Sequence, residues 1–128
     1  MRDLNEVTRE IVDAAYSVHS RLGPGLLESV YEALLSREME RRGFTVRRQM
    51  AVPLEVDGLH FDEAFRIDLL VDERVVVELK SIERLSPIHT KQLITYLRLM
   101  NLQVGLVINF GGMTLKEGLR RVVNGYAS

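Results

Sequence analysis

The chain has 128 residues, a formal net charge of −1, 46% hydrophobic residues and 27% charged residues. These values are typical of one compact domain, which we expect to span residues 1–128. The absence of Cys excludes disulfides, thiolate metal sites and Cys nucleophiles. No apolar run reaches the roughly 20 residues of a membrane helix, and the polar N-terminus lacks a signal-peptide core, so we expect a cytoplasmic protein without membrane association.

Two helices are predicted in the first third of the chain. Apolar residues recur at helical spacing over 6–22, which predicts the first helix. Gly23-Pro24-Gly25 then breaks the chain. A second apolar stripe predicts a helix over 26–42, which ends before Gly43.

The middle of the chain changes to a pattern typical of strands. Short strands are predicted over 44–48 and 51–56, and Pro53 indicates that the second of them lies at a sheet edge. The Asp57-Gly58 turn signal then leads into a long strand over 59–71.

The last part of the chain alternates between the two kinds of element. A polar turn at 72–74 precedes 75–80, the most β-prone segment of the sequence. Ser86-Pro87 starts a helix that we expect over 86–101, because Ser favours the cap and Pro the first helical position. A buried strand is predicted over 104–110 and a short helix within 114–124. The order α-α-β-β-β-β-α-β-α predicts an α/β sandwich around a mixed sheet.

Two carboxylates, Asp68 and Glu78, lie inside apolar strand sequence, where a charge is unfavourable unless it is paired or binds a metal. If residues 72–74 form a three-residue turn, Asp68 falls opposite Glu78 on the same face of the hairpin. Lys80 shares that face, because side chains alternate along a strand. A turn of two residues would place Asp68 on the opposite face.

Facing carboxylates repel each other unless a cation bridges them or one of them is protonated. Two hard oxygen ligands suit Mg²⁺ or Mn²⁺, and the backbone carbonyl of Leu79 could supply another ligand. Such a metal activates water and polarises a phosphoryl oxygen, while Lys80 could stabilise the developing charge or position the attacking water. The alternative is a solvated strand face that carries no chemistry.

Asp68 followed by Glu78-Leu79-Lys80 resembles the Asp…Glu-x-Lys signature of the PD-(D/E)XK nuclease superfamily. Gly25-Leu26-Leu27-Glu28-Ser29-Val30-Tyr31 resembles the motif of the GxxExxY protein family, a small branch of that superfamily. Later segments, including Gln92 and residues 104–111, are also similar to the family. The resemblance implies a restriction-endonuclease-like α/β/α sandwich with a central mixed β-sheet and a metal-dependent nuclease core.

The resemblance implies roles for two helical residues. Glu28 would be an additional metal or water ligand from the helix before the sheet, and Gln92 would orient the site or touch the phosphate. The alternatives are a Glu favoured by the helix dipole and a surface Gln above a buried Tyr96. Tyr31 is more typical of a core or supporting residue, and a lone His89 on a helix is usually not a ligand.

We therefore expect a Mg²⁺-dependent nuclease that hydrolyses phosphodiester bonds as an endo- or exodeoxyribonuclease, with DNA favoured over RNA. The metal ligands would be Asp68, Glu78, the Leu79 carbonyl and Glu28, and the catalytic residues Lys80, Glu28 and Gln92. Arg84, Lys91 and Arg98 flank the third predicted helix and could contact phosphates. The alternative is a non-catalytic module that keeps the fold to bind nucleic acid or protein. The analogy with small nucleases, which often need two copies to cut both strands, favours a homodimer.

Overall fold

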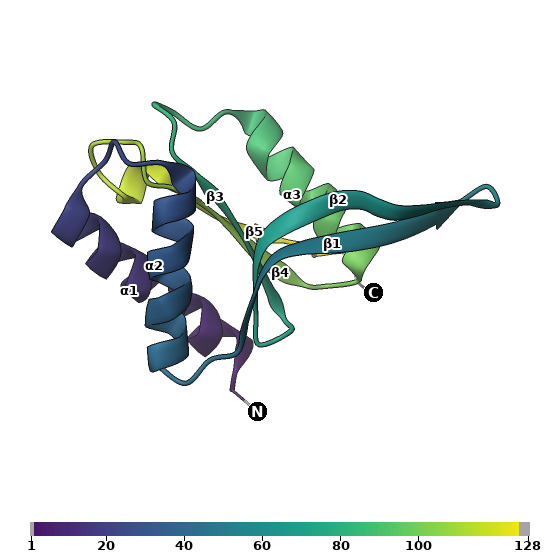
Figure 1. Ribbon diagram of the computed structural model, residues 1–128, viewed down its shortest axis with the longest axis horizontal. Coiled ribbons are helices and arrows are strands. Elements are labelled where there is room, and N and C mark those ends of the chain that lie inside the picture. The colour runs from purple at the N-terminus through teal and green to yellow at the C-terminus, as the bar shows by residue number, and fades with distance from the viewer. Residues whose placement is uncertain (1, 126–128) are drawn as a thin grey trace.

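The computed structural model describes residues 2–125, so residue 1 and residues 126–128 of the predicted domain lie outside the described part. Two helices, three strands, a third helix and two more strands follow one another along the chain (Figure 1). Their bounds are α1 Leu4–Leu22, α2 Glu28–Arg41, β1 Val46–Val56, β2 Leu59–Val71, β3 Val75–Lys80, α3 Pro87–Met100, β4 Val104–Asn109, the 3₁₀ turn η1 Lys116–Gly118, and β5 Leu119–Val123. Within residues 2–125, no helix is long and apolar enough to cross a lipid bilayer.

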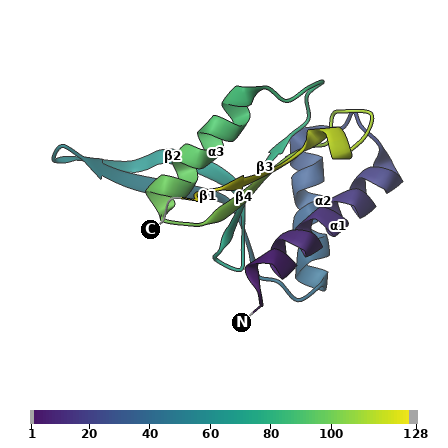
Figure 2. The ribbon, with the colours of Figure 1, turned by 180° about the vertical axis from the view of Figure 1, so that it is seen from behind.

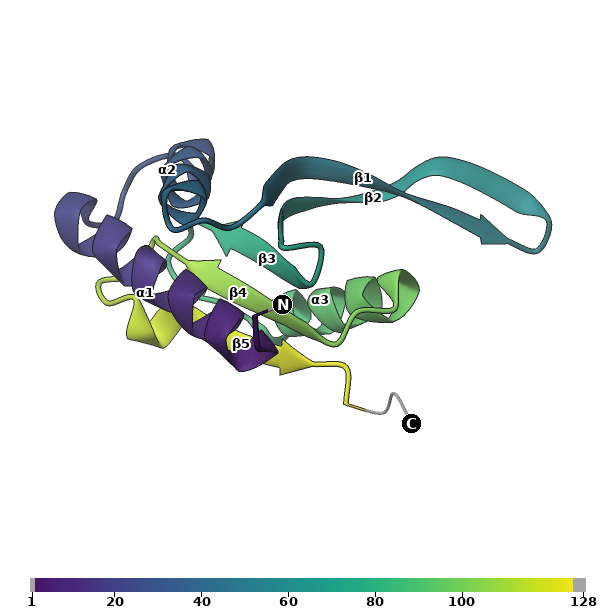
Figure 3. The same ribbon diagram turned by 90° about the horizontal axis from the view of Figure 1, so that it is seen from below.

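The five strands form one mixed sheet in the order β1-β2-β3-β4-β5. Strands β3 and β4 are parallel, because α3 carries the chain back between them, and all other neighbours are antiparallel. Helices α1 and α2 cover one face of the sheet and α3 covers the other (Figures 2 and 3). This arrangement confirms the predicted α/β sandwich with a central mixed sheet and is consistent with a restriction-endonuclease-like fold.

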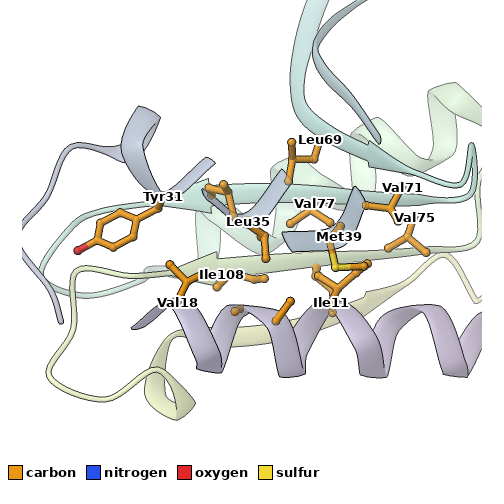
Figure 4. Packing of buried hydrophobic residues seen from close by; sticks show 14 of the residues in the cluster. Ile11, Val18, Tyr31, Leu35, Met39, Leu69, Val71, Val75, Val77 and Ile108 are labelled. Carbon is orange, nitrogen blue, oxygen red and sulfur yellow. The ribbon is translucent and has the colours of Figure 1, made fainter. Parts of the chain in front are cut away.

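The alternating side chains of β3 contribute to a hydrophobic core on each face of the sheet. Val77 and Leu79 belong to the core under α1 and α2, and Figure 4 shows Val77 among side chains of both helices. Val76 belongs to the core under α3. Since neighbouring side chains alternate, Glu78 and Lys80 point to the α3 face of the sheet.

The β1–β2 hairpin differs from the prediction at one point. The sequence predicts two strands, 44–48 and 51–56, where the structure has the single strand β1. Gln49 lies between them with a left-handed φ of 49°, yet the residues on both sides of it keep their partners on β2, so the ladder continues. Strand β1 is an edge strand, as Pro53 predicts, and residues 53–64 form an arm that projects beyond the rest of the molecule (Figure 1).

The C-terminal segment is the second difference. The short helix predicted within 114–124 is present only as the three-residue 3₁₀ helix η1, and the prediction misses β5, which follows it and pairs with β4. Leu119 packs against the core under α1 and α2, whereas Val122 is buried in the core under α3. Residues three apart reach opposite faces of a sheet but the same side of a helix. A strand can therefore place Leu119 and Val122 in the cores on opposite faces of the sheet, whereas a helix cannot.

Candidate active site

The β2–β3 hairpin has the three-residue turn that the sequence predicts. Val71 pairs with Val75 across residues 72–74, and the ladder continues to Leu69 and Val77, where it ends. Asp72 and Glu73 both adopt left-handed backbone conformations, with φ of 52° and 56°. This turn brings Asp68 to the edge of β3 beside Glu78.

Asp68 joins β3 through its side chain. Its Oδ2 accepts a hydrogen bond of 2.7 Å from the backbone N–H of Leu79, so a carboxylate takes the place of a strand carbonyl where the paired ladder ends. Asp68 and Glu78 are therefore neighbours, although not as the regular ladder pair that we predict from the sequence.

Glu78 is the most perturbed acid of the site. The residue is only 7% exposed, and its Oε1 has no hydrogen-bond partner among residues 2–125. Burial raises the pKa of Glu78 to about 9, and the hydrogen bond and negative charge of Asp68 contribute to the rise, while the charge of Lys80 acts in the opposite direction. Glu78 therefore keeps its proton at neutral pH, unless a cation replaces that proton.

Backbone geometry places the Leu79 carbonyl on the Asp68 side of β3. The Lys80 carbonyl accepts the N–H of Phe110 at 2.8 Å, so the polar groups of Lys80 face β4. Successive residues of a strand direct their N–H and C=O groups to opposite edges. The N–H of Leu79 reaches Asp68, and its carbonyl faces the same edge.

Glu28 on α2 is influenced by the charges of two of these residues. It is the first residue of α2 and is exposed to solvent. Partial burial raises the pKa of its carboxyl, the charge of Asp68 raises it further, and Lys80 lowers it. The charges of Asp68 and Lys80 therefore act on the Glu28 carboxyl, and its role as a metal or water ligand stays a prediction.

The loop before Glu28 is fixed at two points. The hydroxyl of Tyr31 donates to the Gly23 carbonyl at 2.5 Å and accepts from the N–H of Leu26 at 3.2 Å. The hydroxyl of Ser81 donates to the Leu26 carbonyl at 2.7 Å. Tyr31 itself is fully buried and stacks on Phe110 at 4.5 Å, which confirms the interpretation of it as a core residue. A cleft of about 460 Å³ lies between this loop and residues 81–83.

Helix α3 carries Tyr96, Gln92 and His89, of which Gln92 is the predicted site residue. Tyr96 stacks on Phe65 at 4.1 Å, and the charges of Glu78 and Asp68 raise the pKa of its hydroxyl in addition to burial, so this side chain faces the acidic pair. Gln92 lies one turn earlier, is exposed, and makes no side-chain hydrogen bond within the described chain. His89 accepts the backbone N–H of Ser86 at 3.0 Å, which is a capping role and not that of a ligand.

Three further residues, which the sequence reasoning missed, lie against Asp68 or support its neighbours. The carboxylate of Glu32 is buried and accepts hydrogen bonds from Arg48 at 3.2 Å and from the Gln49 amide at 2.6 Å. The same amide nitrogen donates to Asp68 Oδ1 at 3.1 Å. One signal was available, because Glu32 lies within the apolar stripe of its helix, where a carboxylate needs a partner.

The fold and the site together define an α/β protein with a lysine and an acidic pair at the carboxyl end of β3, the central strand of its sheet. The sequence matches the PD-(D/E)XK nuclease superfamily over residues 5–122, and the chain belongs to this superfamily. Membership suggests nuclease activity and a nucleic-acid substrate. Comparison with curated proteins and with solved structures gives no match.

Proposed function

We propose that the protein is a metal-dependent nuclease that hydrolyses phosphodiester bonds, with DNA as its substrate. The observation that carries this proposal is the buried Oε1 of Glu78, which lacks a partner beside the carboxylate of Asp68. Two adjacent acids, one of them buried, are unfavourable without a neutralising donor unless a cation or a shared proton joins them. The motif of Gly25, Glu28 and Tyr31 supports placement in the GxxExxY branch.

The residues present fit Mg²⁺ or Mn²⁺. Asp68, Glu78 and the Leu79 carbonyl offer hard oxygen ligands on one edge of β3, with Glu28 close enough to influence them. Residues 2–125 contain no cluster of three or more acidic or His side chains that forms a ready-made cage. A small protein ligand set with room for water is the usual coordination of Mg²⁺, which keeps several of its waters.

The chemistry divides between the cation and the chain. A bound metal lowers the pKa of its water and polarises a phosphoryl oxygen. Lys80 supplies a fixed positive charge next to Glu78, where negative charge develops on the phosphate. Glu28 has a raised pKa at an exposed position, which suits proton exchange with water. We assign Gln92 the role of orienting the scissile phosphate from α3.

The charges on the surface support an approach of the nucleic acid along the body of the protein. Residues 53–64 of the arm include four acidic residues and no Lys or Arg, so this arm would repel phosphates. Lys91 and Arg98 are exposed on α3. Cations there could bind the backbone of a substrate. Two copies would then cut the two strands of a duplex.

Calorimetric titration with Mn²⁺ tests the metal site. We expect binding to the wild type and none to Asp68→Ala. Glu40→Gln is the matched control, because Glu40 lies on the same helix as Glu28, roughly 18 Å further along it, and should bind Mn²⁺ like the wild type. Absence of binding to the wild type, or equal binding to Asp68→Ala, would refute the site.

Plasmid cleavage tests the catalytic role separately. We expect Lys80→Ala to bind Mn²⁺ but to cleave about 10²-fold more slowly, which is the usual effect of losing one electrostatic contact to a transition state. Undiminished cleavage by this variant would exclude Lys80 from the chemistry. Mn²⁺ and DNA binding without cleavage by the wild type would instead identify a non-catalytic binding module.

A further inference from the structure

We propose that Gln49 is a positioning residue, which Glu32 holds in place and which orients the carboxylate of Asp68 in the candidate active site. The proposal rests on the proposed function, because it assigns Asp68 a ligand's role. The supporting observations are independent of that role. They are a hydrogen-bond chain, an unusual backbone conformation and a buried carboxylate.

The amide of Gln49 bridges two carboxylates. Its Nε2 lies 2.6 Å from Glu32 Oε1 and 3.1 Å from Asp68 Oδ1. Ionised carboxylates only accept hydrogen bonds, and an amide nitrogen carries two hydrogens, so one hydrogen serves each acid. The orientation of the amide therefore follows from its neighbours, and a side chain without two donors cannot replace it.

The backbone at Gln49 is shaped for this contact. Its φ of 49° lies in the left-handed region, which residues other than glycine rarely adopt inside a strand. Its carbonyl accepts a hydrogen bond of 2.7 Å from Arg66 of the neighbouring strand. The local turn interrupts neither flanking pair of the β1–β2 ladder. An unfavourable conformation that is held by a specific donor points to a demand on the side chain.

Glu32 connects this contact to the helix that carries Glu28. It is 4% exposed and lies one turn after Glu28 on α2. Its second oxygen accepts the Arg48 guanidinium at 3.2 Å, so both carboxylate oxygens have donors. These hydrogen bonds from Glu32 through Gln49 to Asp68 thus fix the position of Asp68 relative to α2, the helix that carries Glu28.

The result is a carboxylate that is held at both oxygens. Asp68 Oδ1 accepts the Gln49 amide and Oδ2 accepts the N–H of Leu79. Carboxylate ligands of metals are commonly oriented by such outer contacts, whose removal weakens metal affinity or activity by about 10–100-fold. Gln49 would act through Asp68 and would not touch the metal or the substrate.

Hydrogen exchange of the Leu79 amide tests the proposal in the presence of EDTA, without metal or activity. We expect Gln49→Met to accelerate exchange of the Leu79 N–H about tenfold, because Asp68 loses one of its two anchors. Arg47→Met is the control, since the exposed Arg47 pairs with Glu73 and contacts none of Glu32, Gln49 and Asp68, and it should leave this exchange unchanged. Unchanged exchange in Gln49→Met, or equal acceleration in Arg47→Met, would overturn the proposal.

Mn²⁺ affinity supplies the second measurement. We expect Gln49→Met to bind about 10–100-fold more weakly and Arg47→Met to stay within about threefold of the wild type. Gln49→Asn separates reach from backbone strain, because Asn tolerates a left-handed φ but is one methylene shorter. It should lose affinity as well, and wild-type affinity in Gln49→Asn would overturn the proposal. Failure of the wild type to bind Mn²⁺ would refute the proposed function, while Leu79 exchange would still decide the role of Gln49.

Discussion

Replacement of Glu78 by Gln should stabilise the protein in EDTA and abolish its stabilisation by Mn²⁺. The raised pKa of Glu78 means that the folded protein takes up a proton at neutral pH, or else holds two charged acids together. A Gln side chain has nearly the same shape and no charge. Its amide can donate to Asp68 as the protonated carboxyl does. The variant therefore removes the electrostatic penalty and the ligand together.

The magnitude follows from the shift of the pKa. In the unfolded chain Glu78 titrates near 4.5, and in the folded protein near 9. The stability that this carboxyl contributes is fully present below the lower value and is lost as the pH rises toward the upper one. At about 1.4 kcal/mol per pH unit, the loss between pH 5 and pH 7 is roughly 2–3 kcal/mol. The neutral amide of E78Q does not titrate, so this variant should escape the loss.

Urea unfolding at several pH values measures the effect. In EDTA, the free energy of unfolding of the wild type should fall relative to E78Q from pH 5 to pH 8. Mn²⁺ at 100 times its dissociation constant should then stabilise the wild type by about 2.7 kcal/mol and E78Q not at all. A constant difference between the two proteins across this range would refute the reasoning, because Glu78 would then titrate like an exposed acid.

Three further outcomes are expected. Binding of Mn²⁺ at pH 7 should release about one proton, which calorimetry in buffers of different ionisation enthalpy measures. The affinity for Mn²⁺ should rise toward pH 9, because Glu78 then loses its proton more easily. Glu28→Gln should slow cleavage about 10²-fold and remove the acidic limb of the pH–rate profile, because the pKa of Glu28 is raised; an unaltered profile would exclude it as the titrating group. Tyr31→Phe should lower the free energy of unfolding by about 1–2 kcal/mol in urea, since it leaves the Gly23 carbonyl and the Leu26 N–H without their partner. Wild-type stability in that variant would mean that the loop does not depend on the hydroxyl.

The sequence predicts the acidic pair because strand pairing is a counting problem. Once the turn at 72–74 has three residues, Asp68 must fall near Glu78, and Lys80 must share the face of Glu78. Counting residues across the turn does not predict that the β2–β3 ladder ends at Leu69. Hydrogen bonding of an Asp side chain to a β3 amide depends on where β2 leaves the sheet, which neither periodicity nor propensity determines.

Other features depend on contacts between distant segments. The left-handed conformation of Gln49 is supported by a hydrogen bond from Arg66 on another strand. The residues around position 49 therefore do not predict it. The strand β5 gains its stability from pairing with β4 and from two cores, and this overrides the helical spacing of its apolar residues. In both cases the local structure depends on tertiary packing. The sequence prediction differs from the structure at these two places for that reason.

Helix α2 shows how a short motif can position a site. Glu28 begins the helix and is influenced by the charge of Asp68, and Tyr31, three residues later, is buried and fixes the loop that precedes Glu28. Glu32, one turn after Glu28, reaches the amide of Gln49 and through it Asp68. Residues spaced by three and four lie along one side of a helix, so one element can hold its own acid, its loop and an acid on the sheet. The spacing of Glu28 and Tyr31 therefore places the acid and the residue that fixes its loop on the same helix. Glu32 connects that helix to Asp68 on the sheet through Gln49.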